Sequence, residues 1–211
     1  MAGLDFGEIL VTFVVLIASL TFHEAAHAWT ANWLGDPTAR LLGRLSLNPV
    51  VHVDPIGTLL FPLIAMVTGA PLIGWAKPVP VDMRNLRDPK RDFAIVALAG
   101  PVSNLVLAVV GIVVLLAAFG TGGTALRGGD VVALGLFYFV RLNVLLAVFN
   151  MIPIPPLDGG NVLIGILPTP MAEVVERLRT YGFVLLYLLL FSGVLGAITR
   201  PVDRMILSLL L

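Results

Sequence analysis

Cysteine is absent from this chain, and histidine occurs only three times among its 211 residues. The lack of cysteine excludes disulfide bonds and thiolate metal sites, so His, Asp and Glu remain as the strong metal ligands. Charged residues are also scarce, at 12% of the chain, whereas soluble domains carry about 25%. Lys and Arg together number 13, as do Asp and Glu. The resulting net charge of zero argues against nucleic acid as a partner.

Hydrophobic residues dominate instead, at 58% of the chain, and the mean hydropathy is +1.01. This composition indicates an integral membrane protein. Four apolar segments each approach the roughly 20 residues needed to cross a bilayer; they cover about 7–33, 93–119, 131–151 and 180–199. The first segment has no Lys or Arg before it and no cleavage site after it, so we expect it to be retained. We expect one membrane-embedded domain over residues 1–211.

A fifth apolar segment, residues 56–75, is interrupted by Pro62, Pro71 and several glycines. It either crosses the membrane or enters it and returns on the same side. If it crosses, the Lys and Arg residues outside the spans divide seven to five between the two sides; if it returns, they divide nine to three. The positive-inside rule favours the second arrangement, with the N-terminus outside and residues 34–92 on the cytoplasmic side.

The first apolar segment contains His23-Glu24-Ala25-Ala26-His27, an H-E-x-x-H pattern. Positions i and i+4 share one face of a helix, so His23 and His27 can direct two imidazoles toward one metal ion. Zinc hydrolases use this arrangement: two imidazoles hold the ion, and a carboxylate, here Glu24, takes a proton from the zinc-activated water. Residues 9–22 are lipid-like in sequence, which predicts that the site lies below the membrane surface.

A catalytic zinc ion usually has three protein ligands, so a third ligand must come from another segment. The best candidate is Asp158, which follows three prolines and precedes Gly159 and Gly160. The two glycines allow close backbone approach. An aspartate at membrane depth is costly beside lipid and is best explained by a counter-charge such as zinc. Alternatively, Asp158 caps a short helix at the membrane surface, because Asp is a favoured N-cap residue.

Three motifs in this order resemble the site-2 protease family of intramembrane zinc metalloproteases, peptidase family M50. They are the H-E-x-x-H sequence, Gly100-Pro101-Val102-Ser103-Asn104, and Asn150 through Asp158-Gly159-Gly160. The resemblance implies an all-α polytopic membrane fold with a three-helix catalytic core, additional helices and a re-entrant segment at 56–75. It also implies one Zn2+ per chain, bound by His23, His27 and Asp158, with Glu24 as the general acid and base.

The resemblance further implies that the substrate is a transmembrane segment of another protein, hydrolysed within the lipid bilayer. Asn150 matches an asparagine that holds substrate or the oxyanion in this family. Residues 38–47 fall where the family has a membrane-associated β-hairpin, and residues 75–82 are a second candidate strand for docking an extended substrate. An irregular loop is the alternative for both. No PDZ or CBS sequence is present, so we expect the minimal form, in a prokaryotic cytoplasmic membrane with its active site toward the cytoplasm.

Three further polar residues each have two interpretations. Asn104 either donates to a substrate carbonyl or ties helices together. His52 and Asp54 either support the metal site, as an outer pair, a gate or an accessory ligand, or they only structure a loop.

Two other classes of protein also place His and Asp within a membrane. In a metal-ion transporter, these residues are transit ligands and Glu24 is dispensable for chemistry. A non-catalytic scaffold would be expected to have lost a ligand or the base. Because His23, Glu24, His27 and Asp158 are all present, the protease interpretation is favoured.

Overall fold

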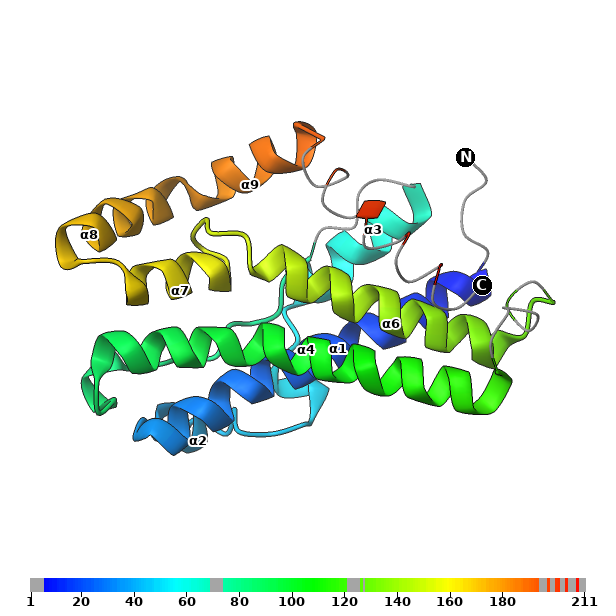
Figure 1. Ribbon diagram of the computed structural model, residues 1–211, viewed down its shortest axis with the longest axis horizontal. Coiled ribbons are helices and arrows are strands. Elements are labelled where there is room, and N and C mark those ends of the chain that lie inside the picture. Colours follow the sequence, from blue (N-terminus) through cyan, green and yellow to red (C-terminus); the bar gives the residue numbers. More distant parts are fainter. Residues whose placement is uncertain are drawn as a thin grey trace.

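The computed structural model describes residues 6–68, 74–120, 126, 128–193 and, beyond these, positions 197, 200, 201, 204 and 208. Three long apolar helices form its centre: α1 (Phe6–Leu34), α4 (Pro89–Phe119) and α6 (Val131–Asn150). Each is long and apolar enough to cross a membrane. In Figure 1, α4 runs antiparallel to α1 and to α6 and packs against both. The expected three-helix centre of a polytopic membrane protein is therefore present.

Side chains of Asp residues begin two of these helices. Asp88 accepts from the amide of Arg91, with Pro89 in the first turn of α4, and Asp130 accepts from the amides of Val132 and Ala133 at the start of α6. Such N-caps satisfy amides that have no partner within the helix. The caps thus set where each crossing helix starts.

Small and branched apolar residues join the crossing helices. One cluster between α4 and α6 contains Ala108, Leu115, Ala133, Val140 and Val144. Small residues allow helix backbones to approach closely, which is how helices associate in lipid, where the solvent is itself apolar. The outer surface of α4 carries exposed valines, at positions 102, 106, 109, 110 and 113, as expected of a face in contact with lipid.

The described residues at the two ends of the segment 57–75 lie close together. The π-helical turn η2 (Pro55–Leu60) continues into α3 (Phe61–Thr68). The amide of Trp75 then donates to the carbonyl of Gly57 at 3.1 Å, and the Trp75 ring meets Phe61 edge to face, with centroids 5.4 Å apart. Both ends of the segment 57–75 therefore lie together.

The β-hairpin expected at residues 38–47 is wrong, because residues 38–41 form a short helix, α2 (Thr38–Leu41), followed by turns. The physical reason is Asp36, whose carboxylate accepts from both the amide and the hydroxyl of Thr38. These bonds start a helical turn at a place where the family resemblance implied a β-hairpin.

Residues 75–82 are extended but pair with no strand in the described part of the chain. Pro78 and Pro80 have no N–H group, so this segment cannot donate all the backbone hydrogen bonds that pairing with a strand requires. We call residues 74–82 the extended segment. It leads through η3 (Met83–Asn85) to α4.

The remaining helices follow α6. They are α7 (Asp158–Ile166), which packs on α4, then α8 (Thr169–Leu178), η4 (Arg179–Tyr181) and α9 (Gly182–Phe191). A further short turn, η1 (Pro49–Val51), precedes η2. The fourth expected span, 180–199, is helical as far as Phe191, and its last part lies largely outside the described residues.

Candidate metal centre

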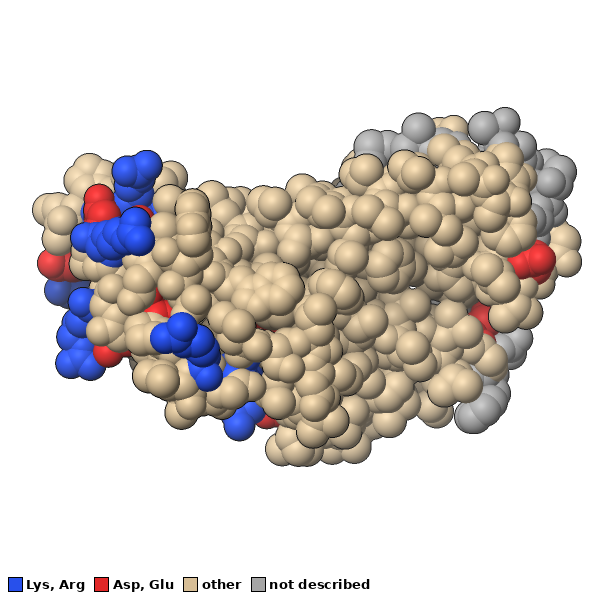
Figure 2. Space-filling model, turned by 90° about the horizontal axis from the view of Figure 1, so that it is seen from below, with Lys and Arg blue, Asp and Glu red and all other residues tan. Residues whose placement is uncertain are grey.

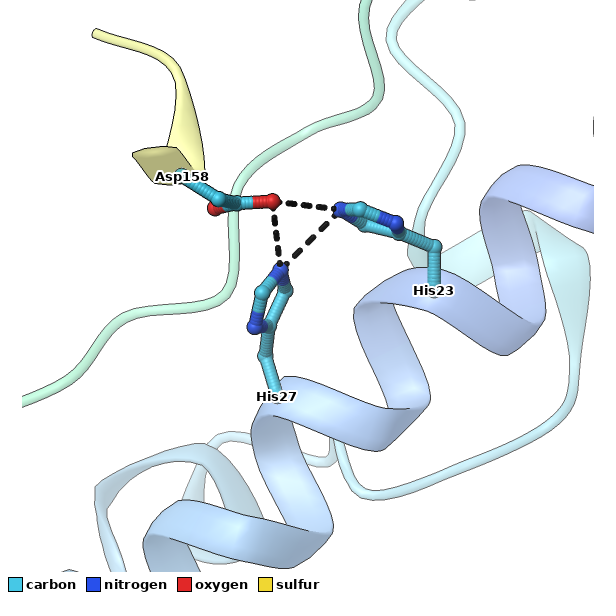
Figure 3. A group of neighbouring side chains, drawn as sticks. All are labelled: His23, His27 and Asp158. Atoms are coloured by element: carbon cyan, nitrogen blue, oxygen red, sulfur yellow. Dashed lines mark hydrogen bonds and ion pairs between the residues drawn. The ribbon is translucent and has the colours of Figure 1, made fainter. Parts of the chain in front are cut away.

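Three ligating side chains converge between α1 and α7. The Nε2 atoms of His23 and His27 lie 3.1 Å apart, and the Oδ2 atom of Asp158 lies 3.0 Å from the first and 3.4 Å from the second (Figure 3). This is the one group of three His or acidic residues that could hold a metal ion in the described part of the chain. Both histidines are buried. The structure thus brings together the three residues that the sequence nominated as ligands.

Asp158 reaches this position through a tight turn between α6 and α7. A Cβ atom on Gly159 would lie 2.4 Å from the Met151 carbonyl oxygen, and one on Gly160 would lie 2.4 Å from the backbone nitrogen of Pro155. The predicted close backbone approach at these glycines is confirmed. Leu157 occupies the N-cap position of α7, and the Asp158 carboxylate points at the imidazoles instead of capping the helix.

Gly100 lets α4 approach the two histidines. A Cβ atom at this position would lie 2.4 Å from His27 Nε2 and 2.6 Å from His23 Nε2, distances that real Cβ atoms do not adopt. Sequence reasoning included Gly100 in a motif without assigning it a role. Its role is visible only where α4 packs over α1.

Each imidazole is oriented by a hydrogen bond at its other nitrogen. His23 Nδ1 lies 2.6 Å from Asn104 Oδ1, and His27 Nδ1 lies 2.7 Å from the carbonyl oxygen of Val96. Carbonyl and amide oxygens only accept, so each Nδ1 is the protonated donor. In the neutral form of each imidazole, Nε2 then presents its lone pair to the site, and this is the tautomer that metal ligation requires.

The donor set fits a zinc ion. Two imidazole nitrogens face each other and a carboxylate oxygen, and Asp158 Oδ2 is buried without a hydrogen-bond partner. With both imidazoles neutral, these three atoms present only lone pairs to one another and repel unless a cation joins them. Tetrahedral zinc, with bonds of about 2.0–2.2 Å, places its ligand atoms about 3.3–3.5 Å apart, close to the separations of 3.0–3.4 Å found here.

Glu24 lies beside the histidines and contacts the extended segment. Its Oε2 atom accepts a hydrogen bond from the amide of Val79 at 2.9 Å. The buried guanidinium of Arg44 holds the same segment, because its Nη2 donates to the carbonyls of Lys77 at 2.5 Å and Pro78 at 3.4 Å. Burial lowers the pKa of Arg44, while the charge of Glu24 opposes that shift. The Glu24 side chain therefore reaches from helix α1 to a stretch of backbone that Arg44 also holds.

The other nominated residues lie in different surroundings. Asn104 is fully buried, and its contact with His23 corresponds to the interpretation as a tie between helices. Asn150, the last residue of α6, donates to the carbonyl of Leu146 in its own helix at 3.0 Å. The structure assigns it no hydrogen bond to His23, His27 or Asp158 among the described residues.

His52 and Asp54 make the contacts of loop-structuring residues. His52 is buried, with Nε2 2.8 Å from the Ser46 carbonyl oxygen. Asp54 accepts from the amides of Ile56 at 3.0 Å and Gly57 at 2.7 Å at the start of η2. Neither side chain belongs to the three-ligand group.

Sequence reasoning missed four residues that support the site. Val79 and Arg44 hold Glu24 and the extended segment, and Ser19 and Asn143 accept hydrogen bonds from the Asn104 amide. Asn143 carried a usable signal, because an amide in the middle of the apolar segment 131–151 needs a buried partner. Val79 carried none, since its contribution is a backbone amide.

The fold has three apolar helices that can cross a membrane, and it brings two histidines of one of them and an aspartate of a later helix into a possible metal site. These features define a class of membrane proteins with a candidate metal centre. Comparison with known sequences identifies the family. Residues 11–190 match the sequence model of peptidase family M50, and the chain belongs to this family. The predicted resemblance to site-2 proteases is confirmed.

Named relatives come from bacteria and an archaeon. The chain is 40% identical over 196 residues to "Putative zinc metalloprotease YwhC" of Bacillus subtilis, covering 87% of this chain and 81% of that protein. It is 33% identical over 188 residues to "Putative zinc metalloprotease Rip2" of Mycolicibacterium smegmatis, covering 87% and 69%. It is 43% identical over 69 residues to "Putative zinc metalloprotease MJ0611" of Methanocaldococcus jannaschii, covering 32% and 31%. No solved structure matches the chain.

Proposed function

We propose that this protein is a zinc-dependent endopeptidase that hydrolyses peptide bonds within transmembrane segments of other proteins. The observation that carries the proposal is the convergence of three potential ligand atoms, from His23, His27 and Asp158, beside Glu24 of a helix that can cross a membrane. His27 is seven residues from the end of α1, a rise of about 10 Å. The site is therefore proposed to lie about two helical turns below the membrane surface.

His23, His27 and Asp158 are proposed to hold the zinc ion. When bound, zinc supplies a Lewis acid that polarises the scissile carbonyl and activates water. Glu24 acts as general base and then general acid: it accepts a proton from the attacking water and delivers it to the leaving amine. The Val79 amide engages Oε2, so Oε1 is the oxygen proposed to carry the proton.

Substrate is proposed to bind in an extended conformation near the extended segment. A peptide bond inside a helix is hydrogen-bonded and shielded, so the substrate must unwind locally before it is attacked. Asn150, eight residues before Asp158, is proposed to hold the substrate strand or the oxyanion as cleavage proceeds. The experiment below does not depend on this last assignment.

The end of the molecule at which α1 ends and α4 begins is proposed to face the cytoplasm. Figure 2 shows the Lys and Arg side chains of the visible face gathered at this end, mixed with acidic ones, whereas the coloured side chains at the opposite end are acidic. The positive-inside rule places such a basic end inside the cell.

Residues 56–75 are proposed to re-enter on this side, because Trp75 and Gly57 are hydrogen-bonded, whereas a crossing would separate the ends by about 30 Å. The membrane is proposed to be a prokaryotic cytoplasmic membrane.

Zinc content and cleavage, measured together, test the proposal. Wild type and Glu24→Gln, purified in detergent, are expected to hold one zinc per chain by elemental analysis, whereas Asp158→Ala loses it. Glu24→Gln is expected to lose cleavage of reconstituted single-span peptides by about 1,000-fold or more. Asp130→Asn, at the far end of the molecule, is the matched control and retains both properties.

Three results would contradict parts of the proposal. Wild type that binds no zinc even after zinc addition would favour a scaffold. Cleavage by Glu24→Gln would remove Glu24 as the base. Zinc transport that survives in Glu24→Gln, with no cleavage by wild type, would favour a transporter.

A further inference from the structure

A buried chain of hydrogen bonds joins His23 to all three crossing helices. Asn104 of α4 accepts from His23 Nδ1 at 2.6 Å and donates through Nδ2 to Asn143 Oδ1 of α6 at 2.8 Å and to the Ser19 carbonyl of α1 at 3.3 Å. Asn143 donates in turn to Ser19 Oγ and to the Phe139 carbonyl, both at 2.9 Å. Ser19, Asn104 and Asn143 are fully buried, so water cannot replace any of these partners.

The direction of this chain is determined at Asn143. The Phe139 carbonyl can only accept, so the NH2 group of Asn143 must face it and Oδ1 must face Asn104. Asn104 then has to present its own NH2 group to Asn143, and the Ser19 carbonyl requires the same orientation. Reversing either amide would place two oxygens against each other without water between them, which leaves buried acceptors with no donor. Asn104 Oδ1 is therefore left to face His23.

We propose that Asn143 and Asn104 are positioning residues that set the tautomer of His23. Their fixed amides hold the proton on Nδ1 and so keep the Nε2 lone pair available before zinc arrives. The inference rests on the proposed zinc site and goes beyond it, because it assigns a role in metal binding to a residue of α6 that does not touch the ligands. Asn143 acts only through Asn104.

His27 provides an internal reference for this proposal. Its Nδ1 donates to the backbone carbonyl of Val96, which side-chain substitutions at positions 104 and 143 leave in place. Substitution of an outer partner of a metal-bound histidine typically lowers metal affinity about 10–100-fold. We expect Asn104→Leu to fall in this range and Asn143→Leu to have a smaller effect of the same kind.

Nuclear magnetic resonance of the zinc-free protein tests the tautomer directly. The chain has three histidines, so selective 15N-histidine labelling gives three imidazoles to assign. Wild type is expected to carry Nδ1–H on His23 and His27. In Asn143→Leu and Asn104→Leu, His23 shifts toward the Nε2–H form while His27 does not. Asn143→Asp in its protonated form donates its O–H to the Phe139 carbonyl and keeps an oxygen toward Asn104, so it is expected to restore the His23 tautomer.

A double-mutant cycle on zinc affinity, measured by chelator competition, tests whether Asn143 acts through Asn104. The double variant is expected to bind zinc as weakly as Asn104→Leu alone, whereas independent structural effects would multiply. Ser103→Ala, which removes a bond from the same helix to the Gly100 carbonyl, is the matched control and keeps wild-type affinity.

Two outcomes would overturn the inference: an unchanged His23 tautomer in Asn143→Leu, or multiplicative losses in the cycle. If His27 also changes tautomer, Asn143→Leu has lost the fold, and Asn143→Ser, whose side chain is too short to reach Asn104, replaces it. Failure of wild type to bind zinc would contradict the proposed function but would leave the tautomer result readable, so the two failures are distinguishable.

Discussion

The backbone amide of Val79 donates a hydrogen bond to Oε2 of Glu24 over 2.9 Å, across 55 positions of the chain. Val79 lies between Pro78 and Pro80, neither of which has an N–H group, so it is the only amide donor of this three-residue stretch. Arg44 fixes the carbonyls of the two preceding residues. The candidate base is therefore oriented by a backbone segment that leads to α4, in addition to its own helix.

Replacing Val79 by proline removes this one donor and keeps the extended backbone that its neighbours already favour. A hydrogen bond to a charged group contributes about 1.5–3 kcal/mol, so we expect kcat for a reconstituted single-span substrate to fall about tenfold or more. KM and zinc content are expected to stay near wild type. Val79→Ala retains the amide and is the matched control. A wild-type kcat in Val79→Pro would show that the bond does not orient Glu24 during catalysis.

Gly100→Ala is expected to separate α4 from the metal ligands. The added Cβ would lie 2.4 Å from His27 Nε2, and overpacking of this kind costs about 1–3 kcal/mol. Zinc affinity, measured by chelator competition, should fall about 10- to 100-fold. Gly135→Ala on α6 is the control, because its Cβ would meet only Val11 Cγ1 at 3.6 Å. Unchanged zinc affinity in Gly100→Ala would mean that the two helices are not held this close.

Asp36 is expected to make stability depend on pH. Burial raises its pKa, but hydrogen bonds from Thr38, Asn85 and the amide of Asp82 outweigh this effect and lower the pKa below its ordinary value of 3.8. A carboxyl group with a lower pKa in the folded state contributes stability above pH 3.8 and loses it as pH falls through the folded value.

Thermal unfolding in detergent from neutral pH down to pH 3 measures this dependence. At neutral pH, Asp36→Asn should destabilise the fold by about 1–3 kcal/mol, because an amide cannot accept from all these donors. The difference from wild type should shrink below about pH 4. Asp130→Asn preserves an N-cap at an exposed position, since Asn caps as well as Asp, and should unfold like wild type. A constant difference at all pH values would contradict the assignment.

Hydropathy predicted the crossing helices well, since their length and composition are dictated by lipid. It placed the start of α4 at residue 93, four residues late, because the first turn at Pro89 is polar and begins at the Asp88 cap. Spacing predicted His23 and His27 as a pair, because both lie on one helix. The hairpin expected at residues 38–47 does not form, because the hydrogen bonds from Thr38 to Asp36 start a helical turn there.

The supporting residues of the site were less predictable because they meet only through tertiary packing. Asn104 and Asn143 are 39 positions apart, and nothing local in either helix indicates which amide faces which. Glu24 could be predicted as a base from its motif, but its partner at Val79 could not, because a backbone amide has no signature in sequence. Residue types therefore predicted which three side chains converge, and packing determined what orients them.

The absence of cysteine makes each introduced cysteine the only thiol, which allows the proposed topology to be tested. Leu42→Cys and Arg87→Cys lie at exposed positions before and after the segment 56–75, and Gly128→Cys is exposed between α4 and α6. A membrane-impermeant maleimide should label positions 42 and 87 from the cytoplasmic side and position 128 from the other side. If 56–75 crossed the membrane, positions 42 and 87 would be labelled from opposite sides. That result would also contradict the hydrogen bond between Trp75 and Gly57, because a crossing segment cannot bring its two ends together.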